Sequence, residues 1–216
     1  MNVDAKTLVT WTDEPRLTGV AWAAANCRRV ARQAWVLACS SFISLLGSLS
    51  TPGMKPACRL QAWALRRMGV TCPSNEVWVG PHVYFDYPQN LVLGRRITIG
   101  PESRLTARSP IVLGDDFLSA PGLMINTGTH DAVTLVPQSL PVTIGAGVWC
   151  GARVTIGAGV AVGEGAVIGA GSLVLKDLPP RHLAFGVPCK PQRPLPDRSP
   201  ARQWSNFRST PPECLP

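Results

Sequence analysis

The residues best suited to chemistry stand together in one short stretch, Thr127-Gly128-Thr129-His130-Asp131. An imidazole titrates near neutral pH, so His130 can take a proton from a hydroxyl group while that hydroxyl attacks a carbonyl carbon. Asp131 has two interpretations: its carboxylate orients the imidazole, or it caps a turn. The stretch is therefore a candidate for general-base catalysis, and a surface histidine without a role is the alternative for His130.

This stretch stands where a regular repeat is interrupted. Glycines recur every six residues from Gly145 to Gly169, each following an aliphatic residue or Cys150, and a small or aliphatic residue comes four positions after that one. The same period runs upstream from Leu93 to Ile125, with a two-residue slip at Ile111–Val112, and it stops between Asp131 and Val142. The expected inward residues are Ile144, Val148, Cys150, Val154, Ile156, Val160, Val162, Ala166, Ile168 and Ser172.

A period of six predicts the element that must position the stretch. An α-helix cannot keep such a period on one face, because it has 3.6 residues per turn. Three short strands joined by corners form a triangular coil, and stacked coils pair as a parallel sheet does. The sequence therefore predicts a mainly β fold, a parallel β-helix over residues 77–190, with a loop that leaves the helix at His130. By itself, the general crossover rule favours a right-handed coil.

The preceding residues 1–76 are expected to form a helical segment. Gln33–Met54 carries no charged side chain and follows Arg28, Arg29 and Arg32, so it has three interpretations: a cap on the β-helix, a helix in the membrane interface, or a membrane span. A second, amphipathic helix is expected over Arg59–Met68, ending at Gly69. Its expected apolar face is Leu60, Trp63, Ala64 and Met68.

Composition excludes several classes of protein. The net charge of +8 suits anionic cofactors and anionic membranes, whereas no pattern typical of nucleic-acid binding accompanies it. Seven cysteines without a Cys-x-x-Cys pair favour reduced thiols in the cytoplasm over a disulfide framework or a zinc knuckle. Acidic residues before the first apolar run do not fit a secretory signal. The Pro- and Arg-rich residues 191–216 are expected to be a flexible tail.

The hexads, the Thr127–Asp131 stretch and the ending Ala184–Lys190 together resemble the hexapeptide-repeat acyltransferases, whose fold is a left-handed parallel β-helix. Within them the chain most resembles the colanic-acid-type exopolysaccharide acetyltransferases, through Leu65–Gly69 and Tyr87–Leu91 as well. The loop after His130 is shorter than usual there and lacks the customary aromatic residues. The resemblance implies a homotrimeric, acetyl-CoA-dependent O-acetyltransferase that modifies a sugar hydroxyl, with His130 as the general base. A cytoplasmic location, with peripheral contact to the inner face of the membrane, fits this activity.

The resemblance also implies where the acyl donor binds. Trp149 points outward beside the inward Cys150, and in related enzymes a tryptophan here lies along the pantetheine arm; trimer packing is its alternative role. Ala152 and Ala170 are small residues at coil corners, where a thin pantetheine chain can approach the backbone. The other residues expected to bind coenzyme A are Leu175, Lys176, Lys190 and Arg193. The three basic residues among them are expected to contact its phosphates.

Some chemical alternatives are disfavoured and others stay open. Cys150 occupies an inward position, so a covalent acyl-cysteine is not expected. The oxyanion of direct transfer needs a donor, which is a backbone N–H or a side chain such as Ser119 or Asn126. An N-acyltransferase for an amino sugar and a non-enzymatic β-helix scaffold are the alternative functions.

A zinc enzyme is the sharpest competitor on the same fold. Carbonic anhydrases of this fold bind zinc through three histidines across a trimer interface, and this chain has His82, His130 and His182. No second histidine lies a few residues from His130, as that zinc motif requires. No metal is therefore expected.

Overall fold

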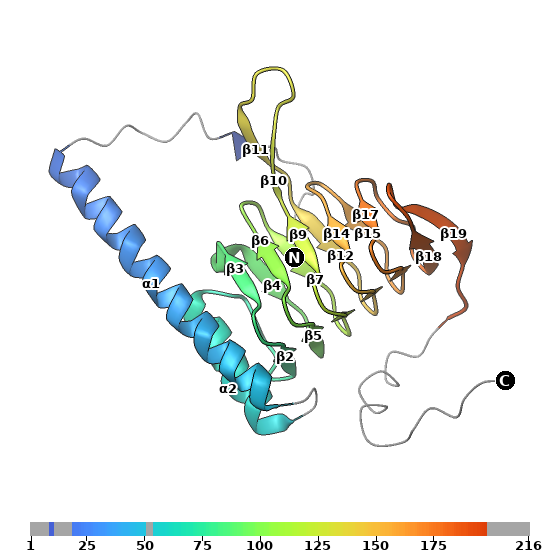
Figure 1. Cartoon of the computed structure of the whole chain (residues 1–216), viewed down its shortest axis with the longest axis horizontal. Helices are drawn as coiled ribbons and strands as arrows, with labels where there is room; N and C mark the ends of the chain where they lie inside the picture. The colour runs from blue at the N-terminus through green and yellow to red at the C-terminus, as the bar shows by residue number, and fades with distance from the viewer. Residues whose placement is uncertain (1–8, 11–18, 51–53, 198–216) are drawn as a thin grey trace.

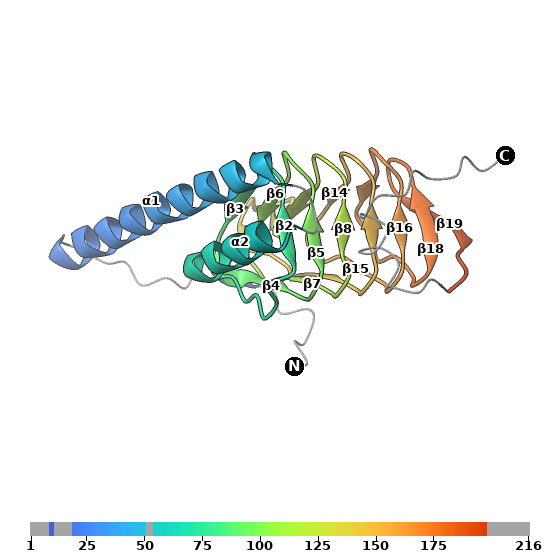
Figure 2. The same ribbon diagram turned by 90° about the horizontal axis from the view of Figure 1, so that it is seen from below.

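The computed structural model describes residues 9–10, 19–50 and 54–197 of the chain. Short strands follow one another around three faces, and successive coils stack into a parallel β-helix with two helices at its N-terminal end (Figures 1 and 2). The predicted mainly β architecture is confirmed. The described residues begin with β1 (Val9–Thr10), which pairs with a hairpin that projects from the β-helix.

Each coil passes over three faces in the same order. Face 1 consists of β2 (Val77–Val79), β5 (Ile97–Ile99), β8 (Leu118–Ser119), β13 (Trp149–Cys150), β16 (Val167–Ile168) and β18 (His182–Phe185). Face 2 consists of β3 (Tyr84–Asp86), β6 (Arg104–Thr106), β9 (Met124–Asn126), β14 (Thr155–Ile156) and β17 (Leu173–Val174). Face 3 consists of β4 (Leu91–Leu93), β7 (Ile111–Leu113), β12 (Val142–Ile144) and β15 (Ala161–Val162). We number the coils 1 to 5 from the N-terminus and name the corners by the faces they join.

The predicted hexad phase is confirmed by the core. All ten expected inward residues between Ile144 and Ser172 are buried, and so are the upstream residues of the same period. The slip, however, was placed wrongly. β7 pairs in regular register with β4 and β12, and the additional residues lie before it, in the 2–3 corner 107–110. In coil 1 the same corner holds a short 3-10 helix, η2 (Pro88–Asn90).

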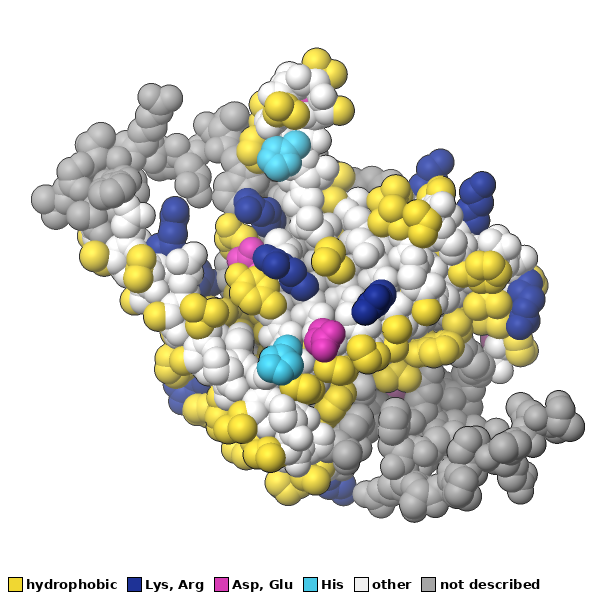
Figure 3. All heavy atoms as spheres, in the orientation of Figure 1, with side chains coloured by type: hydrophobic (Ala, Val, Ile, Leu, Met, Phe, Trp, Pro, Cys, Tyr) yellow, Lys and Arg dark blue, Asp and Glu magenta, His cyan; other side chains and the backbone are white. Residues whose placement is uncertain are grey.

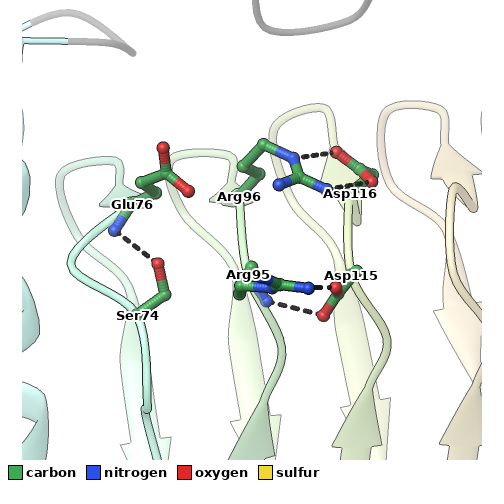
Figure 4. Close-up of polar contacts among 6 residues, drawn as sticks. All are labelled: Ser74, Glu76, Arg95, Arg96, Asp115 and Asp116. Carbon is green, nitrogen blue, oxygen red and sulfur yellow. Dashed lines mark hydrogen bonds and ion pairs between the residues drawn. The ribbon is translucent and has the colours of Figure 1, made fainter. Parts of the chain in front are cut away.

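Two ion pairs at the 3–1 corner join coils 2 and 3 (Figure 4). Arg96 Nε and Nη2 lie 2.5 and 2.8 Å from the two carboxylate oxygens of Asp116, which is only 3% exposed. The hydrogen bond to Asp116 raises the pKa of Arg96. Asp115 accepts from the backbone N–H of Arg95 at 2.8 Å and from its side chain, and these contacts lower its pKa. Asp116 is thus a buried carboxylate whose charge is balanced by Arg96 across the stacked corners.

The first helix, α1 (Gly19–Leu49), covers the open N-terminal end of the β-helix with its C-terminal half (Figure 1). Cys39 and Ile43 are buried in the common core, and a Cβ on Gly47 would lie 2.5 Å from the carbonyl oxygen of Val79. This is the arrangement of a helical cap. By length and composition alone, Ala24–Leu49 could also cross a membrane, and 17% of its most apolar window is buried.

The second helix, α2 (Lys55–Met68), ends where expected but turns a different face inward. Gly69 takes the left-handed conformation at φ 99°, and its N–H donates to the carbonyl of Arg66. The predicted apolar face is confirmed for Ala64 and Met68, which are buried, and wrong for Leu60 and Trp63, which are 46% and 48% exposed. The buried residues of α2 are Ala57, Cys58, Gln61, Ala62, Ala64, Leu65 and Met68.

The helix is packed closely enough to bury a polar side chain. Gln61 donates its amide N–H to the carbonyls of Val79 (2.7 Å) and Ile43 (3.2 Å), and its Oε1 accepts from the N–H of Val79. This one side chain of α2 therefore hydrogen-bonds to backbone groups of two other elements, α1 and β2. Small residues on α2 allow this close approach.

The β-helix ends in an antiparallel hairpin rather than at residue 190. β19 (Lys190–Pro194) pairs with β18, Leu195 donates its N–H to the carbonyl of Arg181, and Arg181 forms an ion pair with Asp197. The expected boundary of the tail was therefore placed too early. Residues 198–216 of the expected tail lie outside the described residues.

Candidate active site

The hairpin that projects from the β-helix leaves coil 3 at the 2–3 corner, as the interrupted repeat predicted (Figure 1). It consists of β10 (Gly128–His130) and β11 (Pro137–Ser139), with His130 opposite Pro137. β1 adds a third strand, since Val9 pairs with Ser139. His130 is exposed to solvent on this hairpin.

A buried polar cluster fixes the base of the hairpin. Thr127 is fully buried, and its hydroxyl accepts from the N–H of Ser109 at 2.9 Å while lying within reach of the carbonyls of Thr106 and Ser109. The hydroxyls of Ser109 and Ser139 are 2.8 Å apart. Buried groups that lost these partners would each cost about 1–3 kcal/mol. Thr127 therefore sets the direction in which the chain leaves the coil toward His130.

Asp131 is bound to the tip of the hairpin. Its Oδ1 accepts from the N–H groups of Val133 (3.0 Å) and Thr134 (2.7 Å) and from the hydroxyl of Thr134 (2.9 Å). These contacts lower the pKa of Asp131, and the hydrogen bond from the Thr134 N–H has the largest effect. In the part of the chain that is described, Asp131 makes no hydrogen bond to the imidazole of His130. Of its two interpretations, turn capping is the one this geometry supports.

The hairpin and face 2 enclose a pocket of about 650 Å³. Its floor is a row of three polar residues in register on β3, β6 and β9, namely Asp86, Thr106 and Asn126. Arg104 and Met124 pair across β6 and β9 and add a second row of the same floor. The two strands of the hairpin, β10 and β11, form one wall. His130 is part of this wall, so its imidazole borders a polar cavity.

Most of this floor was not predicted from the sequence. Asp86, Thr106 and Asn126 are 20 residues apart along the chain, because the 2–3 corners of coils 1 and 2 are each longer than a hexad repeat allows. This interval of 20 residues was the feature of the sequence from which the floor could have been predicted. Counting back from Asn126 in steps of about one coil length would have found the other two residues.

The two side-chain candidates for the oxyanion donor have different surroundings. Ser119 is 3% exposed, its hydroxyl accepts from the N–H of Gly100 at 3.0 Å, and it does not line the pocket, so this candidate was wrong. Asn126 does line the pocket. Its Oδ1 accepts from the N–H of Gly128 at 3.0 Å, which leaves its amide N–H₂ as the group able to donate to a ligand.

The expected cofactor residues fall in two places on the β-helix. Trp149 stands outward on face 1 and is 40% exposed, and Ala152 and Ala170 stack at the adjoining 1–2 corner, where the N–H of Gly171 donates to Ala152. Leu175 and Lys176 instead lie at the 2–3 corner of coil 5. Lys190 and Arg193 are exposed on β19, at the end of face 1.

Leu175 and the pocket share one row of the β-helix. The register of β9, β14 and β17 places Gly157 next to Asn126, and Leu175 next to Gly157. A Cβ on Gly157 would lie 3.1 Å from Cδ2 of Leu175, so the leucine side chain leans into the space the glycine leaves. Leu175, one of the expected cofactor residues, therefore lies in the same row of the β-helix as Asn126 of the pocket.

Trp149 belongs to the group that a single chain does not bring to the pocket. The hairpin leaves the 2–3 corner, whereas Trp149 is on face 1, the face opposite that corner in a triangular coil. Cys150, its neighbour, is fully buried, and burial raises the pKa of its thiol to about 12. A thiol with this pKa stays protonated near neutral pH and is a poor nucleophile. Among the described residues, no group of three His, Cys, Asp or Glu side chains could hold a metal ion.

Known proteins match both the repeat and the whole β-helix. Residues 141–176 match the bacterial transferase hexapeptide family (six repeats). The chain is 34% identical over 149 residues to the galactoside O-acetyltransferase of Escherichia coli (strain K12), covering 67% of this chain and 73% of that protein. A putative acetyltransferase of Schizosaccharomyces pombe is 31% identical over 71% of this chain and 77% of its own length.

Solved structures agree with these sequence matches. A galactoside acetyltransferase in complex with coenzyme A superimposes with a TM-score of 0.60 and 28% identity, over 77% of this chain and 83% of that one. A maltose O-acetyltransferase from Clostridium difficile 630 superimposes with a TM-score of 0.62 and 26% identity, over 77% and 89% of the two chains. The predicted family is confirmed. The chain belongs to the hexapeptide-repeat acetyltransferases.

Proposed function

We propose that the protein is an acetyl-CoA-dependent O-acetyltransferase that modifies a sugar hydroxyl of an exopolysaccharide or glycan precursor. The observation that carries the proposal is the pocket in which His130 borders the polar floor formed by Asp86, Thr106 and Asn126. Hydroxyl-rich ligands need several hydrogen-bonding groups in one cavity. Relatives named as galactoside and maltose O-acetyltransferases support a sugar acceptor, and one solved relative binds coenzyme A.

The mechanism requires one proton transfer and no covalent enzyme intermediate. His130 takes the proton of the acceptor hydroxyl as that oxygen attacks the acetyl carbonyl carbon. The amide N–H₂ of Asn126 donates a hydrogen bond to the oxygen on which negative charge develops. When the carbon–sulfur bond breaks, the imidazolium returns its proton to the departing thiolate, so His130 ends neutral. Cys150 takes no part, because it is buried.

We infer that the working unit is a homotrimer with its acetyl donor between two chains. Trp149, Ala152, Ala170, Leu175, Lys176, Lys190 and Arg193 remain the proposed coenzyme A residues. Because Trp149 stands on face 1, away from the hairpin, it can reach an acetyl group beside His130 only from a neighbouring chain. Three chains related by closed symmetry would form three equivalent clefts of this kind.

Mixed trimers test this arrangement. A chain with His130→Ala and a chain with Trp149→Ala are each expected to have little activity, whereas equal amounts allowed to exchange subunits should regain about a quarter of the wild-type sites. The reason is that a cleft works when its histidine comes from one variant and its tryptophan from the other. Acetyl transfer is measured after subunit exchange has been verified by mass spectrometry. No regained activity would place both residues in the cleft of one chain.

We also propose that α1 lies on the inner face of a membrane, with the enzyme in the cytoplasm. Since Cys39, Ile43 and Gly47 pack on the β-helix, the same turns cannot cross a bilayer without leaving these contacts. With 100° per residue, the opposite side of α1 is apolar and exposed, and the net charge of +8 favours anionic lipid. The exposed apolar residues of this side are Val30, Leu37, Leu45 and Leu49.

Sedimentation with vesicles tests this contact. The full chain is expected to bind vesicles that contain anionic lipid, and the double variant Leu37→Glu, Leu45→Glu should lose most of this binding because it places charge in the apolar stripe. Val187→Glu is the matched control, since Val187 is exposed at the opposite end of the molecule. Equal binding by the double variant and the control would exclude α1 as the contact.

An acceptor screen tests the activity itself. The full chain is incubated with acetyl-CoA and a panel of sugars, amino sugars and oligosaccharides, and released thiol is measured. Ester products that depend on the acceptor are expected. Amide products on amino sugars would instead show an N-acyltransferase, and no transfer to any acceptor would favour a scaffold.

A further inference from the structure

The pocket beside His130 contains more positive charge than a neutral sugar requires. Arg104 on β6 and Arg108 in the following corner both line it, whereas Asp86 is its one carboxylate among the described residues. Figure 3 shows Lys and Arg side chains gathered on the face below the projecting hairpin. Thr106, in the floor of the pocket, lies between the two arginines in the sequence.

Aromatic rings of coil 1 hold both guanidinium groups. The guanidinium carbon of Arg104 lies 4.7 Å from the centre of the Tyr84 ring, and that of Arg108 lies 5.6 Å from the centre of the Tyr87 ring. A Cβ on Gly128 would lie 2.9 Å from Cδ of Arg108, so the hairpin also confines that side chain. A stacked guanidinium keeps its N–H edges for a ligand and loses little freedom on binding.

Arg104 has no ion pair with any carboxylate of the described residues, including Asp86 in the same pocket. Arg95, Arg96 and Arg181, at coil corners, do form ion pairs. A preordered guanidinium in a cavity with a free N–H edge suits a carboxylate or phosphate, which can accept two hydrogen bonds from it.

Coenzyme A does not account for these arginines. The basic residues proposed for its phosphates lie in coil 5 and beyond, whereas Arg104 and Arg108 belong to coil 2. Coils stack about 4.8 Å apart, so about 14 Å separates coil 2 from coil 5. His130 leaves coil 3, between them. The arginines therefore lie on the acceptor side of the imidazole.

We propose that the acceptor is anionic: a sugar unit that carries a carboxylate or a phosphate close to the hydroxyl that is acetylated. Arg104 binds the anionic group and Arg108 adds positive charge to the same pocket, while Asp86 and Thr106 bind neighbouring hydroxyls. This proposal rests on the O-acetyltransferase function proposed above, and it narrows the substrate class of the same pocket.

Three matched acceptors test the proposal with the full chain: methyl glucoside, methyl glucuronide and methyl glucoside 6-phosphate. At least one anionic acceptor is expected to have a kcat/KM about tenfold or more above that of the neutral glucoside, since hydrogen bonds to a charged group contribute about 1.5–3 kcal/mol. The two anionic arms separate a carboxylate site from a phosphate site. An equal or better neutral acceptor would overturn the proposal.

Charge-matched variants locate the effect. Arg104→Gln should bring the ratio of anionic to neutral kcat/KM close to one, mainly through KM, whereas Arg59→Gln should keep the wild-type ratio. Arg59 is exposed on α2, lines no part of the pocket and loses the same charge. The same loss of preference in both variants would mean that overall charge, and not this pocket, attracts the anion.

A binding measurement separates failure of this proposal from failure of the proposed function. Calorimetric titration of the full chain with each acceptor is expected to show tighter binding of the anionic ones, and Arg104→Gln should weaken that binding. Transfer to neutral sugars alone would keep the function and reject the anionic acceptor. Anion binding lost in Arg104→Gln, without any acetyl transfer, would keep the anion site and reject the function.

Discussion

Replacement of His130 by alanine is expected to lower kcat by about 10²–10⁴-fold, with a much smaller change in KM for either substrate. This is the usual effect of losing a general base, because the acceptor hydroxyl must then lose its proton to water. His130 is exposed on the hairpin and makes none of the buried contacts at its base. The melting temperature should therefore stay close to that of the wild type. The measurement is acetyl transfer together with a thermal melt.

His182→Ala is the matched control for that experiment. His182 lies on β18, where its Nδ1 is 2.8 Å from the carbonyl oxygen of Pro180, and it does not line the pocket. Its replacement should leave kcat within about twofold of the wild type. A folded His130→Ala protein with wild-type turnover would remove the proposed base and, with it, the proposed mechanism.

Ile156→Asp is expected to prevent folding altogether. Ile156 is fully buried on face 2, between the equivalent residues of the coils above and below, Ile125 and Val174. A carboxylate there would be surrounded by hydrocarbon without a partner, at a cost of several kcal/mol that approaches the whole stability of a domain. The expected result is insoluble protein or a far-ultraviolet circular dichroism spectrum without β structure.

The neighbouring residue provides the control. Thr155 is one position away on the same strand, and successive side chains of a strand point to opposite sides. Thr155→Asp should fold and melt within a few degrees of the wild type. A soluble Ile156→Asp protein with a normal melt would mean that the hexads are assigned in the wrong phase.

The core was predictable because one steric rule repeats in every coil. Cys150 and Ser172 fit the inward pattern although neither is a large aliphatic residue, and both are buried. The face of α2 was not predictable in this way. Helical periodicity selects the large Leu60 and Trp63, but α2 packs so closely on α1 and β2 that small residues such as Ala57 and Ala62 take buried positions.

The candidate site was predictable only where it broke the repeat. His130 stood out because it lies in the interruption, and Thr127 next to it holds the base of the hairpin. The pocket floor gave no such signal, because outward positions of a coil tolerate any side chain. Asp86 and Arg104 belong to the pocket through stacking between coils, a relation of residues about 20 positions apart that a period of six conceals.

The three corners of the coil differ in how they can change over evolution. At the 1–2 and 3–1 corners, a Cβ on Gly100, Gly114 or Gly151 would lie 2.3–2.6 Å from the backbone of the next coil, so the coils are in backbone contact there and no side chain fits. At the 2–3 corner, the atom nearest to a Cβ on Gly157 belongs to the leucine side chain below it. New segments can thus be acquired at one edge while the stack below stays intact. The 2–3 corner of coil 3 can thus carry a hairpin that shapes the pocket beside His130 while the buried core of the coils stays the same.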